Sequence, residues 1–371
     1  MLETFAVYFS LWSIMNFSAH QSYLCSRDKV NYWGKYALIP IVLFTLIFGL
    51  RYNVGADHLS YLEIFEYAQT AWKSEAVEEG FYLITKLLNK YTADWVYFSL
   101  FALIQIYSLY YVAKDKVYIV RYIPLVLMSG YFLQWMNIMR QATVACVLLV
   151  LINYLTKKDF WKYAVVLLLC SYFLHRSALI LLLLLPIAFV DKIVFVPRWI
   201  QLSCLFISIA LNVSLLFYSL LDPLVYYANI FNYEASVSAI SNYNSEYNYG
   251  PVALLKILIF TIVLFYSNNV RKFYKSRFCD IVFTLFFVGI CFVLMFQGNH
   301  VMKRPFEYFA NMELVVVPYV LSYLHDRKSN RLNRFVYLVL ILSYVLLFLI
   351  MIYKSADPDS FSAFTFLWEH N

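Results

Sequence analysis

Apolar runs long enough to cross a lipid bilayer recur along this chain, and short clusters of Lys and Arg separate them. A helix of about 20 apolar residues matches a hydrocarbon core about 30 Å thick. The 371 residues are 63% hydrophobic and 14% charged, whereas soluble domains are about 45–50% apolar and about 25% charged. The pattern predicts an all-α, polytopic integral membrane protein with one domain over residues 1–371.

The apolar runs predict about twelve transmembrane helices. Their approximate ranges are 4–22, 36–50, 95–113, 118–134, 139–155, 161–175, 177–190, 199–221, 251–267, 279–296, 306–324 and 335–353. Most of the 29 Lys and Arg residues fall in one alternate set of loops. Positive charge is retained in the cytoplasm, so this set is predicted to be cytoplasmic and both termini to face outward. The N-terminus lacks the basic start of a signal peptide and is predicted to be uncleaved.

Two large outer loops, 51–94 and 222–250, are where chemistry is expected. The first is predicted to hold two short interfacial amphipathic helices. One would follow Asp57, which can cap it, and the other would follow Glu78-Glu79-Gly80. The second loop has no Lys or Arg and is rich in Tyr, whose ring face and hydroxyl suit sugar rings. An aromatic belt at the interface is the alternative. The candidate sugar-binding residues of the second loop are Tyr226, Tyr227 and Tyr233.

Four arginines lie on the predicted outer side at the edges of apolar runs: Arg51, Arg140, Arg176 and Arg304. A guanidinium at the centre of a spanning helix costs about 2.5–3.5 kcal/mol on insertion scales. Such residues therefore need an anionic partner, and the oxygens of a pyrophosphate match guanidinium geometry bidentately. For Arg304 the alternative is a local ion pair with Glu307 at i+3. Four arginines opening to one side favour anion binding.

Several classes of function lack their motifs in this sequence. There is no CxxC, HExxH, Walker loop or GxGxxG, which argues against an ATP-driven pump and most metal or dinucleotide enzymes. No metal and no cofactor are therefore expected. The net charge of +7 lies in short clusters between apolar runs, so no nucleic-acid partner is expected. None of the six cysteines falls in a predicted outer loop, and no disulfide framework is expected.

The order of the outer motifs resembles the EpsG family of Wzy-type bacterial polysaccharide polymerases. The motifs are Arg51…Gly55-Ala56-Asp57…Tyr61, then Glu79-Gly80-Phe81, then Asn137-Ile138-Met139-Arg140-Gln141, then Phe173-Leu174-His175-Arg176-Ser177-Ala178. The likeness covers roughly residues 40–190 in motifs and the rest in span number and loop placement. It implies a GT-C-like membrane glycosyltransferase at the outer face of the inner membrane, acting on undecaprenyl-pyrophosphate-linked oligosaccharides of O-antigen or capsule. It also suggests a chain-length regulator as a partner, beside the lipid bilayer.

In such a reaction the four arginines would neutralise the leaving lipid diphosphate without a divalent ion. The acceptor hydroxyl needs a base, which typically contributes about 10²–10⁴-fold. Asp57 is the first candidate because it follows Arg51 at the mouth of the second predicted span. Glu79 and His175 are alternates, and His300 is a fourth candidate base and a candidate sugar ligand.

Three other functions remain open from the sequence. An O-antigen ligase would use the same donor chemistry, and a membrane O-acyltransferase would use His175 or His300 as base. A polysaccharide flippase or transporter predicts polar residues deep in the membrane. Apart from the four arginines on the predicted outer side, the charged residues deep in predicted spans are Lys256 and Glu313, which can pair with each other or with Glu307.

Overall fold

The computed structural model describes residues 2–27, 31–70, 77–193, 196–214, 249–357 and 360–369. These residues form helices, turns and irregular segments, with one isolated β-bridge between Arg51 and Phe366. The all-α prediction is confirmed for this part of the chain. Most of the second outer loop, including Tyr226, Tyr227 and Tyr233, lies outside the described residues, so the predicted sugar-binding role of these tyrosines stays a prediction.

The contacts divide the chain into two compact units, whereas the sequence predicts one membrane domain. The first unit comprises Met1–Asp191 and Val317–Asn371, and the second comprises Lys192–Val316. Each unit is described by itself below.

Six helices in the described part are long and apolar enough to cross a membrane, which supports a membrane protein. They are α5 (Asp94–Ala113), the segment Val117–Asn137, α9 (Met139–Thr156), α14 (Pro251–Tyr274), α15 (Arg277–Met295) and α18 (Arg331–Ser355). Four apolar helices are shorter, namely α2 (Lys35–Gly49), α10 (Phe160–Phe173), η2 (Arg176–Phe189) and α11 (Arg198–Val213). The predicted count of about twelve spans is therefore not confirmed.

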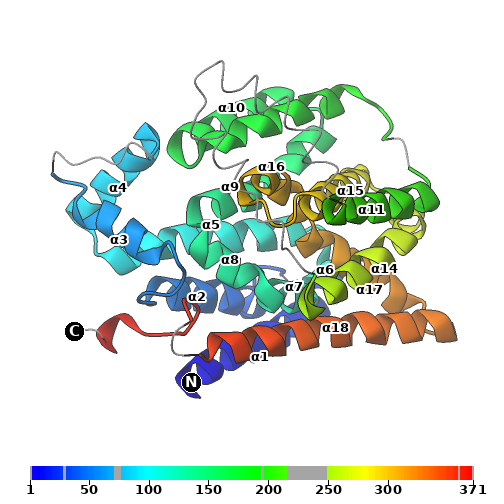
Figure 1. Ribbon diagram of the computed structural model, residues 1–371, viewed down its shortest axis with the longest axis horizontal. Coiled ribbons are helices and arrows are strands. Elements are labelled where there is room, and N and C mark those ends of the chain that lie inside the picture. Colours follow the sequence, from blue (N-terminus) through cyan, green and yellow to red (C-terminus); the bar gives the residue numbers. More distant parts are fainter. Residues whose placement is uncertain are drawn as a thin grey trace. The chain divides into compact units, whose positions relative to one another are not determined.

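The first unit is built on close contacts between successive apolar helices. Helix α2 lies against α5, α5 against α9, and α10 against η2, while α1 (Leu2–Arg27) contacts both α2 and α18 (Figure 1). The α2–α5 crossing depends on Gly49, because a Cβ there would lie 1.8 Å from Ser99 Oγ. The segment Val117–Asn137 is irregular and consists of α6 (Val117–Val120), α7 (Ile123–Val126), η1 (Leu127–Tyr131) and α8 (Phe132–Asn137).

Helix η2 is a 3₁₀-helix of 14 residues rather than the predicted α-helix. Three of its four buried residues, Ala178, Leu181 and Leu184, recur every third position, as expected at three residues per turn, and the fourth is Ala188. A 3₁₀-helix rises about 2.0 Å per residue, so this run extends about 28 Å, close to the hydrocarbon thickness. An α-helix of the same residues would extend only about 21 Å. The run of leucines in the sequence did not indicate a 3₁₀-helix rather than an α-helix.

The predicted span 306–324, which crosses the boundary of the two units at Val316, is broken. Helix α16 (His300–Ala310) ends before a turn at Asn311 and Met312, and α17 starts at Glu313 and ends at Asp326. Glu313 accepts a 2.6 Å hydrogen bond from Lys256 Nζ, and its side chain is 2% exposed. The mutual pairing of the two deep charges is thereby confirmed, and it neutralises them within the second unit.

Residues 360–369, the C-terminal strap, bind the loop that follows α2. The N–H of Tyr52 donates to Thr365 O at 2.9 Å, and that of Leu367 donates to Leu50 O at 2.9 Å. The N–H of Phe364 donates to Thr4 Oγ1 at 3.0 Å, near the start of α1. The start of α1, the Arg51 loop and the strap therefore lie together, which agrees with the prediction that both termini share a side with Arg51.

Candidate functional site

The segment 51–94, predicted to be an outer loop, contains two helices at the predicted places, α3 (His58–Glu66) and α4 (Glu79–Tyr91), which pack together. Asp57 occupies the N-cap position of α3, but its carboxylate accepts no capping hydrogen bond in the described chain. The expected cap is therefore wrong. Instead the N–H of Asp57 donates to Asn137 Oδ1 at 3.0 Å, which ties the start of α3 to the residues just before α9.

Gly55 allows this attachment in two ways. Its φ of +99° is a left-handed conformation that glycine adopts without strain. A Cβ at this position would also lie 3.3 Å from Asn137 Cα. The turn 51–57 thus lies directly against the chain that enters α9.

Arg51 fixes the same turn from inside. Its guanidinium donates to three main-chain carbonyls: Nη1 to Phe48 O at 2.6 Å, Nη2 to Met136 O at 3.0 Å and Nε to Val54 O at 3.1 Å. The residue is 1% exposed, and burial lowers the pKa of Arg51 to about 9, which still leaves it charged at neutral pH. The expectation is that Arg51 faces an anion, whereas in the structure three of its five N–H groups donate to backbone oxygens and the residue is buried.

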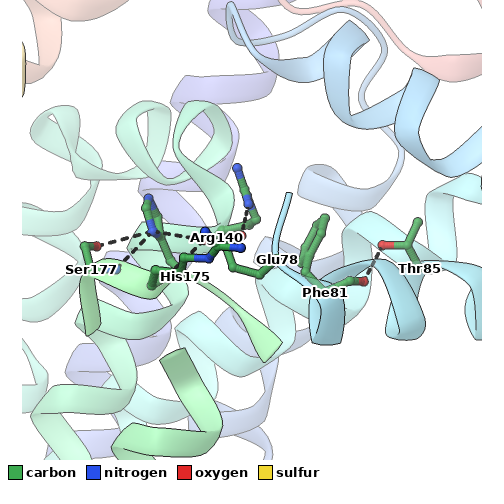
Figure 2. Close-up of polar contacts among 7 residues, drawn as sticks. Glu78, Phe81, Thr85, Arg140, His175 and Ser177 are labelled. Atoms are coloured by element: carbon green, nitrogen blue, oxygen red, sulfur yellow. Dashed lines mark hydrogen bonds and ion pairs between the residues drawn. The ribbon is translucent and has the colours of Figure 1, made fainter. Parts of the chain in front are cut away.

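Glu78 is the centre of the site. Its side chain is 7% exposed and lies with Arg140 and His175, as Figure 2 shows. Oε2 pairs with Arg140 Nη1, and Oε1 accepts the main-chain N–H of Arg176 at 2.9 Å. His175 Nδ1 lies 3.4 Å from Oε1. One buried carboxylate therefore joins segments that were predicted separately as site motifs.

Gly80 brings α4 close enough for these contacts. A Cβ on Gly80 would lie 2.6 Å from the carbonyl oxygen of Tyr172, close to the C-terminal end of α10. Glu78 is the N-cap residue of α4, and the helix buries Gly80, Phe81 and Thr85 behind it. The motif Glu79-Gly80-Phe81 thus meets the motif that contains His175 and Arg176.

Arg140 also contacts α3 and α4 through aromatic rings. Its guanidinium carbon lies 5.1 Å from the Phe81 ring centroid and 5.9 Å from that of Tyr61. Burial raises the pKa of Tyr61, while Arg140 acts in the opposite direction by charge and by a hydrogen bond. Arg140 therefore holds together the outer helices and the start of α9.

The electrostatics of this site favour an anion. Glu78 lies at the N-terminus of α4, contacts Arg140 in the first turn of α9, and caps the first N–H of η2. Each helix N-terminus carries about +0.5 of an elementary charge. Arg140 is therefore at the unfavourable end of its own helix, and Arg176, whose N–H Glu78 accepts, adds an exposed guanidinium. One carboxylate balances only part of this positive charge.

The structure separates the two adjacent glutamates. Glu79, the predicted candidate base, is exposed on α4, whereas Glu78 is buried. Sequence reasoning missed Glu78, although a signal was present. Positions 78, 81 and 85 share one helix face, and the apolar Phe81 marks that face as the buried one.

Arg304 and His300 belong to the second unit. His300 is the first residue of α16, and Arg304 is exposed on the same helix. Glu307 pairs with Lys303 at 3.4 Å, whereas the sequence suggested a local pair with Arg304. Arg140 and the Arg176 segment meet at Glu78, but a convergence of all four arginines stays a prediction because Arg304 lies in the other unit.

Metal-binding side chains are not clustered in the described ranges. No group of three or more His, Cys, Asp or Glu residues there is placed to hold a metal ion. The charged groups that the structure does bring together, Arg140, Glu78 and the His175-Arg176 turn, are suited to binding an anion and transferring a proton.

Comparison with known proteins gives one match. The family model described as the EpsG family matches residues 35–367, which is most of the chain. No curated protein and no solved structure matches.

Proposed function

The chain belongs to the EpsG family, which comprises Wzy-like polymerases, and from that premise we propose that it joins lipid-linked oligosaccharide repeat units into a polysaccharide. The proposed donor and acceptor are undecaprenyl-pyrophosphate-linked oligosaccharides. The proposed location is the outer face of the bacterial inner membrane, with the site facing the periplasm. The Glu78-centred cluster is the observation that supports this proposal.

Arg140 and Arg176 are the proposed ligands of the donor diphosphate. Arg140 uses Nη1 for Glu78, and its Nε makes no hydrogen bond to any described residue. Arg176 is exposed at the start of η2. Preorganised guanidinium groups and helix N-termini stabilise the charge that develops on a leaving diphosphate as its bond to the sugar breaks. Arg51 has a supporting role in this proposal, since it holds the turn that carries Asp57 against α9.

The proposed reaction is a displacement at the anomeric carbon of the donor sugar. The acceptor hydroxyl oxygen forms the new glycosidic bond, while the bond from the anomeric carbon to the diphosphate oxygen breaks. The electron pair of that bond leaves with the diphosphate, and the hydroxyl proton passes to a base. Asp57 and His175 are candidate bases whose contacts lead to the Arg140 segment: the N–H of Asp57 donates to Asn137, and His175 lies against Glu78.

The test compares surface polysaccharide in strains that carry the wild-type gene, a deletion, or single substitutions. Deletion is expected to leave glycans of one repeat unit. Arg140→Lys keeps the charge but loses the bidentate geometry and is expected to shorten the chains strongly, as is Arg176→Ala. Arg331→Ala is the matched control, because Arg331 is an exposed arginine at the start of α18. It is expected to give the wild-type ladder.

Two outcomes would overturn the proposal. A normal ladder after deletion would show that the protein does not polymerise the glycan. Wild-type chain length in Arg140→Lys and Arg176→Ala, at wild-type protein levels, would show that these arginines do not bind the diphosphate.

A further inference from the structure

The pairing of Glu78 with His175 has a consequence for the choice of base. We infer that Glu78 is a positioning residue that orients His175, and that His175 Nε2 takes the proton of the acceptor hydroxyl. This inference rests on the proposed function and names a proton acceptor for it. It assigns a role to Glu78, which the sequence motifs did not single out.

The contacts of His175 Nδ1 decide which ring nitrogen carries the proton. Nδ1 lies 3.4 Å from Glu78 Oε1 and 3.3 Å from Ser177 Oγ, and the main-chain N–H of Ser177 points at Nδ1 from 3.4 Å. An unprotonated Nδ1 accepts that N–H and the Ser177 hydroxyl, whereas a protonated Nδ1 donates to Glu78. The carboxylate decides between them, because a charge-assisted hydrogen bond is roughly twice as strong as a neutral one. A lone pair on Nδ1 would also face the negative oxygen.

A proton on Nδ1 leaves the lone pair of the neutral ring on Nε2. The His175 side chain is 28% exposed, whereas that of Glu78 is 7% exposed. The imidazole is therefore the member of the pair that a substrate hydroxyl can reach. When Nε2 takes the hydroxyl proton, the ring becomes an imidazolium, and the Glu78 carboxylate beside it stabilises this charge.

Arg140 and the Arg176 N–H keep Glu78 in place for this role. The carboxylate accepts from both, so its two oxygens have fixed directions. The arrangement also couples the departure of the diphosphate to the deprotonation of the acceptor hydroxyl. Arg140 contacts the donor diphosphate in the proposed function, and through Glu78 it also fixes the orientation of the ring that receives the acceptor proton.

The test uses the purified full-length protein and lipid-linked single repeat units extracted from the deletion strain. Glu78→Gln keeps an oxygen for the Arg176 N–H but removes the charge. It is expected to lower kcat about 10–100-fold, with the KM for the lipid-linked units changed less than about threefold. His175→Gln is expected to lower kcat by about 10² or more. Ser177→Ala, which removes the competing hydroxyl, is the control and is expected to keep kcat within about threefold.

The double variant separates positioning from a structural role. If Glu78 acts through His175, adding Glu78→Gln to His175→Gln lowers kcat by less than a further factor of about two. The reason is that substitutions of residues that act as a unit do not have additive effects. If Glu78 had only a structural role, Glu78→Gln would instead lower kcat further in the double variant. That result overturns the inference.

The two failures can be told apart. If the wild-type protein does not extend the extracted units, the proposed function fails. If the wild-type protein extends the units and Arg140→Lys abolishes extension, the proposed function stands. If the losses of kcat in Glu78→Gln and His175→Gln then multiply in the double variant, only the positioning role fails.

Discussion

The Glu78 carboxylate lies 2.9 Å from the main-chain nitrogen of Arg176, although 98 residues separate the two in the chain. The contact satisfies an N–H at the start of η2 with the N-cap residue of another helix, α4. It places the outer loop against the hairpin of α10 and η2.

Arg51→Lys is expected to destabilise the protein. Lysine keeps the charge but cannot donate in three fixed directions to Phe48, Val54 and Met136. If the lysine ammonium keeps one of these hydrogen bonds, loss of the other two is expected to lower the free energy of unfolding by about 3 kcal/mol. A fall of the melting temperature in detergent reports this loss. Arg176→Lys, at an exposed position, is expected to melt like the wild type. An Arg51→Lys protein that melts normally yet makes no polymer would show that Arg51 binds substrate.

Gly80→Ala is expected to displace α4 from α10 and to abolish polymerisation. The new methyl carbon would lie 2.6 Å from the Tyr172 carbonyl oxygen, which cannot rotate away as a side chain can. Chain length on a gel and protein level on a blot measure the effect. Gly250→Ala is the matched control, because a Cβ there meets no atom of the described residues within 4 Å. Normal chain length in Gly80→Ala would contradict the close contact of the two helices.

Phe364→Ala is expected to loosen the C-terminal strap. The residue is 4% exposed, and its ring centroid lies 5.7 Å from that of Tyr8 on α1. Truncation of a buried phenylalanine costs about 3–5 kcal/mol, so the melting temperature is expected to fall and the chains to shorten. Phe361→Ala in the same strap removes a side chain that is 68% exposed and is the control. Equal effects of the two substitutions would argue against packing as the cause.

His58 is expected to make stability depend on pH. Burial, and secondarily the charge of Arg51, lower the pKa of His58 to about 3. The unfolded histidine has a pKa of about 6.5, so as the pH falls from 7.5 to 5 the unfolded state takes up a proton and the folded state does not. Folding is therefore expected to lose about 2 kcal/mol over this window through His58.

His58→Phe isolates this term. The imidazole stacks on Phe98 with a centroid distance of 4.5 Å, which a phenyl ring can reproduce. Melting temperatures in detergent at pH 7.5 and pH 5 are expected to differ less in this variant than in the wild type. An unchanged pH dependence would mean that His58 is not neutral in the folded protein.

Much of the site was predictable from the sequence. Gly55, Asn137, Arg140 and His175 were all identified in order along the chain, and the structure brings their segments together around Glu78 and the start of α9. Adjacent residues on a helix differ by about 100° in direction, so Glu78 and Glu79 face different ways. The shared face of positions 78 and 81 favours Glu78 as the buried one, and the approach of α10 to Gly80 shows what covers that face.

The partners of Arg51 also could not be predicted from the local sequence. An arginine at the edge of an apolar run indicates a need for partners but does not say whether they are substrate oxygens or backbone oxygens. The carbonyls of Phe48 and Val54 are local, but that of Met136 comes from a segment 85 residues away. The local sequence carries no information on that third partner.

Apolar run length and the placement of charges are properties of consecutive residues, so they were enough to predict a helical membrane protein and the segments of its candidate site. Which charges face one another follows from the packing of the helices: Glu78 toward Arg140, Arg51 toward the backbone, and Lys256 toward Glu313. The physical reason is that a buried charge must find a partner, and its partner is fixed by helix packing over long separations in the chain.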